Sequence, residues 1–184
     1  MLAAASEVFA EQGFQASTIE QICERANYTR GAFYSNFESK DDLFMALFEI
    51  HADALVERIQ NLIGDAPVAE VAGLLTSYFS EPSDEDRRWY LLSTEFTLHA
   101  IRNPAAAELL AERDRALRET LAPILGAIFE RAGVEPRMPL DRIARALVAF
   151  GEGAQAQSYV EPGELPPGSL ERDFFPLFFE ALSR

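Results

Sequence analysis

The sequence lacks most of the residues that catalytic and metal-binding proteins use. Its 184 residues include one cysteine and two histidines. A single cysteine, Cys23, forms no internal bridge, which excludes a disulfide scaffold and a cysteine-based zinc site and fits a reducing compartment. No H-E-x-x-H motif, phosphate loop or nucleophile elbow is present. We therefore expect no enzyme, no catalytic residue, no metal and no cofactor, and we expect Cys23 to lie in the core.

Long apolar runs and positive charge are also scarce. No stretch approaches the roughly 18 consecutive apolar residues of a membrane helix, and the opening segment has no basic flank, so it is a poor signal peptide. We expect a cytoplasmic protein with no membrane partner. The net charge of −14 argues against coating nucleic acid by bulk electrostatics. Residues 1–48 hold three basic and seven acidic residues, so any DNA contact must be local.

What the sequence does have is helical periodicity. Apolar residues recur at spacings of three and four, and no run alternates over the length of a strand, which predicts an all-α fold of about nine helices. Breakers rich in glycine, proline, asparagine and serine separate these helices. They lie at 13, 27–29, 37–39, 64–67, 81–83, 103–104, 133–139 and 162–168.

The first two predicted helices are short. The first covers about residues 2–12 and ends at Gly13, which adopts a left-handed conformation without steric cost, after which Phe14 returns to the core. The second opens with a capping box, in which Thr18 accepts from the Gln21 backbone N–H and the Gln21 side chain returns to the cap. Its apolar residues form one inward stripe of Ile19, Ile22, Cys23 and Ala26.

A tight turn leads into a third helix with one polar face. Asn27 suits the left-handed position of the turn, and Thr29 is the expected N-cap of a helix over about 30–37. Phe33 and Phe37, four residues apart, face the core. The opposite face then carries Arg30, Gly31, Ala32, Tyr34, Ser35 and Asn36. Small residues, an arginine fork and polar tips are what a DNA major groove accepts, although spacing alone also allows a solvated surface.

Two helix starts could bind phosphate. Ser39 caps a helix predicted over about 40–63, and Lys40 stands beside that cap, so free backbone N–H groups and a cation converge there. The start of the second helix at Thr18 is the other such point. Both points flank the predicted helix-turn-helix.

The residues 2 to about 48 resemble the N-terminal signature of the TetR family. The resemblance is carried by Ala4-Ala5, Phe9-Ala10-Glu11, Gly13-Phe14, Ser17-Thr18-Ile19, Ile22, Arg30 to Phe37 and Ser39 to Leu43. It implies that Thr29, Arg30, Gly31, Ala32 and Tyr34 face base edges, that Thr18, Tyr34, Asn36 and Lys40 hold the DNA backbone, and that Phe33, Phe37 and Leu43 are core. Family members usually have glycine at Asn27 and about ten further residues, often basic, before the first helix. A chain starting at Met1 is expected to bind DNA weakly.

The resemblance also implies a division of labour. Residues 1–45 would be the DNA-binding domain, and residues 46–184 would bind a small-molecule effector and dimerise. Candidate ligand contacts lie on aromatic and polar stripes: Trp89, Ser93, Phe96, His99, Phe129, Phe150, Gln155 and Tyr159. From the residues alone, such stripes are more often core than cavity.

The last two predicted helices, over about 139–157 and 169–183, indicate a homodimer. The final one is apolar around more of its circumference than one packed face can hide, and the one before it is rich in alanine and glycine. A two-fold interface would place two recognition helices about 34–36 Å apart on a palindromic operator. The function predicted is a ligand-responsive transcriptional regulator, a repressor that a small molecule releases. A ligand-binding or interaction dimer of the same fold without DNA binding is the alternative.

Overall fold

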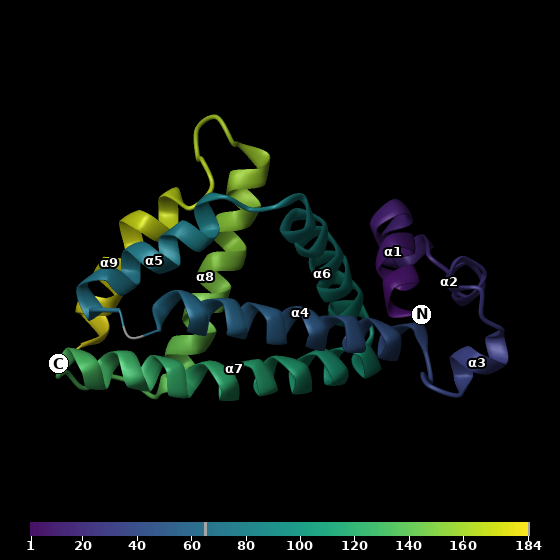
Figure 1. The fold of residues 1–184 in the computed structure, drawn as a ribbon, viewed down its shortest axis with the longest axis horizontal. Helices are drawn as coiled ribbons and strands as arrows, with labels where there is room; N and C mark the ends of the chain where they lie inside the picture. Colours follow the sequence, from purple (N-terminus) through teal and green to yellow (C-terminus); the bar gives the residue numbers. More distant parts are fainter. Residues whose placement is uncertain (65, 184) are drawn as a thin grey trace. The chain divides into compact units, whose positions relative to one another are not determined.

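The structure is a computed structural model that describes residues 1–64 and 66–183. Within these residues the chain forms nine helices and, apart from an isolated bridge between Pro136 and Ser183, no β-structure. Figure 1 shows them in chain order: α1 (Leu2–Ala16), α2 (Ile19–Ala26), α3 (Arg30–Tyr34), α4 (Lys40–Ile63), α5 (Val68–Ser80), α6 (Asp84–Arg102), α7 (Pro104–Ala132), α8 (Leu140–Val160) and α9 (Ser169–Leu182). The predicted all-α fold and number of helices are confirmed.

The helices group into two compact units. The first holds Met1–Ala54 together with Asp84–Arg115, and the second holds Leu55–Ser83 together with residue 116 onward. In the first unit α1 packs on both α2 and α6, and α2 packs on α3. In the second unit α9 packs on α5 and α8. The first unit thus contains α6, most of α4 and the start of α7 in addition to the predicted three-helix domain.

A break at Gly13 shapes α1. Gly13 has φ 77° and ψ 166°, outside the helical region, and the backbone N–H of the next residue, Phe14, donates to Oε2 of Glu95 at 2.7 Å. The predicted departure from the helix at Gly13 is confirmed, but a further helical turn follows and α1 ends at Ala16. Phe14 is fully buried, as predicted.

Local side-chain bonds fix the turn between α2 and α3. The backbone N–H of Gln21 donates to Oγ1 of Thr18 at 3.2 Å, and the Thr18 N–H donates to Oε1 of Gln21 at 2.9 Å. Asn27 is left-handed at φ 55°, and Thr29 accepts from the Ala32 N–H at 3.1 Å. The capping box, the left-handed asparagine and the N-cap of α3 are therefore confirmed.

The third helix is shorter than predicted, since α3 ends at Tyr34 instead of residue 37. The side-chain amide of Asn36 donates to the Ala32 carbonyl at 2.9 Å, which is the acceptor that the Asn36 backbone N–H would use in a longer helix. The Asn36 N–H bonds to the Phe33 carbonyl instead, also at 2.9 Å. Side chains that compete with the backbone for carbonyls disfavour helix extension in this way.

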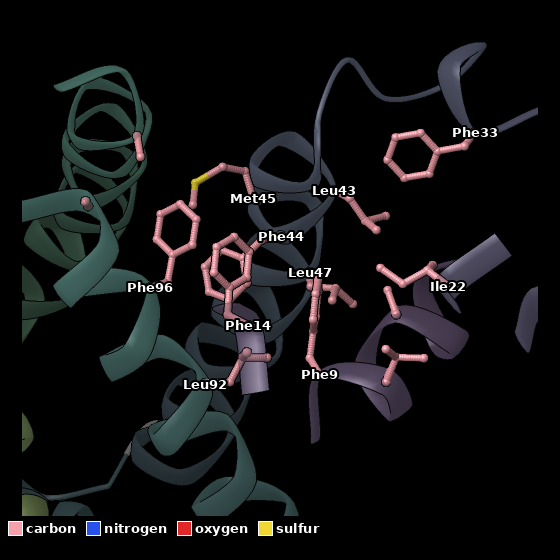
Figure 2. Close-up of a cluster of buried hydrophobic side chains, with 14 of the residues drawn as sticks. Phe9, Phe14, Ile22, Phe33, Leu43, Phe44, Met45, Leu47, Leu92 and Phe96 are labelled. Atoms are coloured by element: carbon pink, nitrogen blue, oxygen red, sulfur yellow. The ribbon is translucent and has the colours of Figure 1, made fainter. Parts of the chain in front are cut away.

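Aromatic side chains from α1, α4 and α6 form the core of the first unit. Figure 2 shows Phe14, Phe44 and Phe96 grouped together, with Phe33 and Ile22 beside Leu43 at the other end of the cluster. The Phe44 ring stacks on Phe96 with centroids 4.2 Å apart. Because Phe33 and Leu43 belong to the same cluster, the helix-turn-helix is anchored to the start of α4. Cys23 is buried in this core, as predicted.

The second unit has a smaller buried cluster and a partly exposed final helix. Ile63, Val71 and Ile128 form its centre, and Phe179 packs against them. Rings of α9 also contact Phe79 and Phe150. On the same helix, Leu177 remains 54% exposed. No helix in the described part of the chain is both long and apolar enough to cross a bilayer.

Candidate nucleic-acid interface

The helix α3 has one buried side and one exposed side. Phe33 is fully buried, whereas Tyr34, the next residue, is 51% exposed. Arg30, Gly31, Ser35 and Asn36 are also exposed, and Ala32 is half-buried. The side that sequence reasoning assigned to DNA is therefore open to solvent, and Tyr34 does not turn into the interior.

Packing of the buried Phe33 holds α3 in place. The Phe33 ring lies 5.7 Å from Phe37 and 5.2 Å from Tyr34, in tilted and edge-to-face geometry respectively. Behind it, the thiol of Cys23 contacts the Thr29 carbonyl at 3.8 Å. Ring contacts of this kind add stability beyond burial alone. The helix α3, which carries Tyr34 and Arg30, thus packs on α2 and α4.

Arg30 is held across α2 and α3. Its Nη1 lies 2.7 Å from Oε1 of Glu20, and its guanidinium lies 5.9 Å from the centre of the Tyr34 ring. A hydrogen bond with Tyr34, and then the charge of Glu20, raise the pKa of Arg30. Sequence reasoning missed Glu20, which stands in the first turn of α2. The ion pair with Glu20 keeps the Arg30 guanidinium near the exposed face of α3, but the Glu20 carboxylate competes with a DNA base or phosphate for that guanidinium.

The smaller polar residues of the predicted site have local partners. Thr18 and Thr29 are exposed N-caps whose hydroxyls accept backbone N–H groups. Ser35 Oγ donates to the Gly31 carbonyl at 2.9 Å, as the Asn36 amide does to Ala32. Exposed Tyr28, in the turn before α3, was not predicted as a contact, although an aromatic residue in a polar turn is a recognisable signal.

Lys40 has a structural position that the sequence did not indicate. Its ammonium donates to the carbonyls of Phe14 at 2.6 Å and Ser17 at 2.8 Å, and it lies 4.4 Å from the centre of the Phe14 ring. Burial lowers the pKa of Lys40. Lysines that bond the last carbonyls of a helix stabilise its C-terminus. Lys40 therefore ties the end of α1 to the start of α4.

Replacing Lys40 with methionine should lower the stability of the first unit. Methionine keeps the contact with Phe14 but leaves two partly buried carbonyls without a charged donor, so we expect a loss of about 2 kcal/mol. Urea unfolding followed by the fluorescence of Trp89, the single tryptophan, measures this loss. If Lys40 instead serves a phosphate alone, stability will be unchanged and only the salt dependence of DNA binding will fall.

The predicted ligand residues are divided between the two units. Trp89, Ser93, Phe96 and His99 belong to the first unit, whereas Phe129, Phe150, Gln155 and Tyr159 belong to the second. Their role in ligand binding stays a prediction.

In the first unit these side chains are engaged in packing. Phe96 is fully buried in the aromatic core, and Trp89 stacks on His51 with centroids 3.9 Å apart. His99 Nε2 lies 3.2 Å from Asp41, and the Ser93 hydroxyl donates to the Tyr90 carbonyl. This is how core side chains behave.

In the second unit Gln155 and Tyr159 share a small cavity. Its walls come from α5, α8, the start of α9 and the segments that follow α5 and α8. The lining residues are Phe79, Pro82, Ala154, Gln155, Ser158, Tyr159 and residues 165–171. Its volume of about 10 Å³ is the space of roughly one water molecule. Phe129 and Phe150 pack instead against rings of α9.

Two regions of the chain match families of known proteins. Residues 1–47 match the family described as bacterial regulatory proteins, tetR family, and residues 67–174 match the family described as BetI-type transcriptional repressor, C-terminal. The HTH-type transcriptional regulator YfiR of Bacillus subtilis (strain 168), itself uncharacterized, is 25% identical over 157 residues, which are 83% of this chain and 75% of YfiR.

Solved structures share the fold. Salmonella enterica GusR superposes with a TM-score of 0.72 and 20% identity, covering 94% of this chain and 89% of GusR. FadR from Bacillus subtilis, in complex with stearoyl-CoA, superposes with a TM-score of 0.70 and 20% identity, covering 94% of this chain and 92% of FadR.

The helical fold and the anchored, exposed α3 define a helix-turn-helix DNA-binding transcriptional regulator. The two matched regions assign its family: the chain belongs to the TetR family.

Proposed function

We propose that this protein is a repressor that binds a palindromic operator as a homodimer and leaves it when a small molecule binds. Residues 1–45 form the DNA-binding domain, and residues 46–184 form the ligand-binding and dimerisation domain. The observation that carries the proposal is the two-sided α3, with Phe33 fully buried and Tyr34 51% exposed. A helix that serves only packing has no need of an anchored and solvent-facing arginine and tyrosine.

The DNA contacts divide into two kinds. Arg30 offers a fork to guanine, and the small residues Gly31 and Ala32 let α3 approach the base edges. Thr29 and Tyr34 complete this group. The residues assigned to positioning on phosphates are Thr18, Asn36, Lys40 and again Tyr34, and Ser35 stands beside them on the exposed side. Phosphate contacts set the register, whereas base contacts set the sequence preference.

The last two helices support the homodimer. Leu177 and Phe174 on α9 are 54% and 39% exposed, and Val160 at the end of α8 is 78% exposed. Large apolar side chains exposed on two consecutive helices favour an interface with a partner. A two-fold axis through them would pair two α3 helices with successive major grooves.

Effector and operator would weaken each other reciprocally. An effector that prefers a conformation with misplaced recognition helices lowers operator affinity by the same factor by which the operator lowers effector affinity. FadR, which shares this fold, was crystallised with a small molecule, and this supports an effector for the present chain.

Selection of operators from genomic DNA, followed by binding titrations at several salt concentrations, tests the proposal. We expect one palindromic sequence to bind on the order of 10³-fold or more tightly than unrelated DNA. Protein with its native N-terminus that shows no selectivity at moderate salt would support the alternative, a ligand-binding dimer of the same fold. A reporter under the selected promoter tests the direction, because its expression rises on deletion of a repressor and falls on deletion of an activator.

A further inference from the structure

The cavity of the second unit combines apolar walls with a few polar groups. Phe79, Pro82 and Leu165 supply apolar walls. Ser158 of α8 and Glu171 of the first turn of α9 line the same cavity. Apolar walls with few placed polar groups are typical of small-molecule sites.

Ser158 has an unsatisfied hydroxyl. The residue is 5% exposed, and in the described part of the chain its Oγ has no hydrogen-bond partner. A buried hydroxyl without a partner is costly, and most such groups in proteins are paired with protein, water or ligand. The Ser158 hydroxyl is therefore free to donate a hydrogen bond to a bound molecule or to accept one from it.

Glu171 adds a buried carboxyl group. The residue is 2% exposed, and burial raises the pKa of Glu171 while its own backbone N–H opposes that shift. A carboxylate taken out of water is stable when a cation or several hydrogen-bond donors compensate it. A ligand that brings positive charge and N–H donors would do both.

We propose that this cavity binds the ammonium head of a small organic amine, which donates N–H groups to the Glu171 carboxylate and to Oγ of Ser158. The volume of about 10 Å³ suits a head group the size of a water molecule, and an aromatic residue, Phe79, lines the same cavity. The inference deepens the proposed function by giving the effector's chemical class, and it rests on that function only for the link to DNA. A carboxylate ligand would meet the charge of Glu171 and is disfavoured.

Titration of the full chain with propylammonium chloride tests the site, with 1-propanol as the neutral analogue of equal length. Amide shifts followed by ¹H–¹⁵N NMR at constant ionic strength give the affinity and its location. We expect saturable shifts at Ser158, Gly168 and Glu171 with the amine, and at least tenfold weaker binding of the alcohol.

Two variants and one control locate the recognition. Glu171→Gln keeps the shape and removes the charge, so we expect at least a tenfold loss of propylammonium affinity. Glu180→Gln, an exposed glutamate on the same helix, should leave the affinity unchanged and so excludes general attraction to an acidic surface. Ser158→Ala removes a buried unpaired hydroxyl, so it should fold at least as well as the wild type and still bind the amine several-fold more weakly.

Three results would overturn the proposal. They are absence of saturable shifts in the wild type, which would mean a cavity for water only; equal binding of amine and alcohol; and unchanged amine affinity in both Glu171→Gln and Ser158→Ala. Because no DNA is present in these titrations, a failure to bind an operator leaves the result intact, and a failure here leaves operator binding intact.

Discussion

Arg30→Ala is expected to lower operator affinity by about 1 to 3 kcal/mol for each half-site, or about fivefold to more than a hundredfold. The proposed dimer would lose the contact twice, and the combined loss of about 2 to 6 kcal/mol is a large part of the roughly 4 to 10 kcal/mol that separates specific from non-specific binding. The reason is structural, because the guanidinium is held on the open side of α3 by Glu20 and Tyr34. Fluorescence anisotropy with the selected operator and with unrelated DNA measures the loss.

The pattern of the loss separates two roles for Arg30. A base contact predicts that affinity falls for the operator and hardly changes for unrelated DNA. A phosphate contact predicts an equal fall for both, with the salt slope reduced by roughly one unit per half-site. Arg102→Ala, at the exposed end of α6, is the matched control. Normal operator binding by Arg30→Ala would refute the assignment of Arg30 to the interface.

Tyr34→Ala completes the test of this face. The tyrosine ring is edge-on to Phe33 and 51% exposed. Its removal should therefore lower the stability of the core little, while it deletes a side chain proposed to contact DNA. The proposed dimer should remain intact in both variants, which sedimentation or light scattering verifies. A variant that loses both DNA binding and assembly would point to folding instead of recognition.

The features of the helix-turn-helix that sequence reasoning predicted correctly are local ones. The bonds between Thr18 and Gln21, the left-handed Asn27 and the cap at Thr29 involve residues at most three positions apart. Capping and turn preferences depend on such short separations, so they can be read from the chain itself. The same applies to Phe33, whose burial follows from its spacing to Phe37.

Contacts between residues far apart in the sequence escaped that reasoning. Lys40 reaches a carbonyl 26 residues away, and Glu95 accepts from an N–H 81 residues away. Neither residue stands out by type or spacing, because a charged side chain on a helix usually faces water. The sequence therefore suggested a phosphate contact for Lys40 and did not reveal its bonds to the carbonyls of Phe14 and Ser17.

The predicted ligand residues show a different limit of sequence-based prediction. Trp89 and Phe96 lie on a helical stripe of the kind that lines a pocket, but the stripe fits a core equally well, and here Phe96 is fully buried among aromatic rings. Gln155 and Tyr159 were chosen by the same reasoning and do line a cavity. Glu171 was missed because an acidic residue in the first turn of a helix has an ordinary explanation in the helix dipole.

Phe44→Ala is expected to destabilise the first unit by about 3 to 5 kcal/mol, the range for deleting a fully buried phenylalanine. Phe44 is fully buried, stacks on Phe96 and Trp89, and meets Phe14 edge-on, so its loss removes contacts on α1 and α6 at once (Figure 2). Few single substitutions elsewhere would remove as many.

Trp89 makes this loss measurable within the first unit. It is the single tryptophan, and its ring lies 5.7 Å from Phe44, so its fluorescence reports unfolding of the first unit while circular dichroism reports all helices. We expect the urea midpoint measured by fluorescence to fall far more in Phe44→Ala than in Phe44→Leu, because leucine keeps part of the apolar volume. Ile101→Ala, 75% exposed on α6, should change it by less than about 0.5 kcal/mol. A loss of similar size in Phe44→Ala and Ile101→Ala would show that the aromatic cluster does not hold α1 and α6 together. The packing of α3 against this cluster would then not explain how α3 is held in position for the proposed contact with DNA.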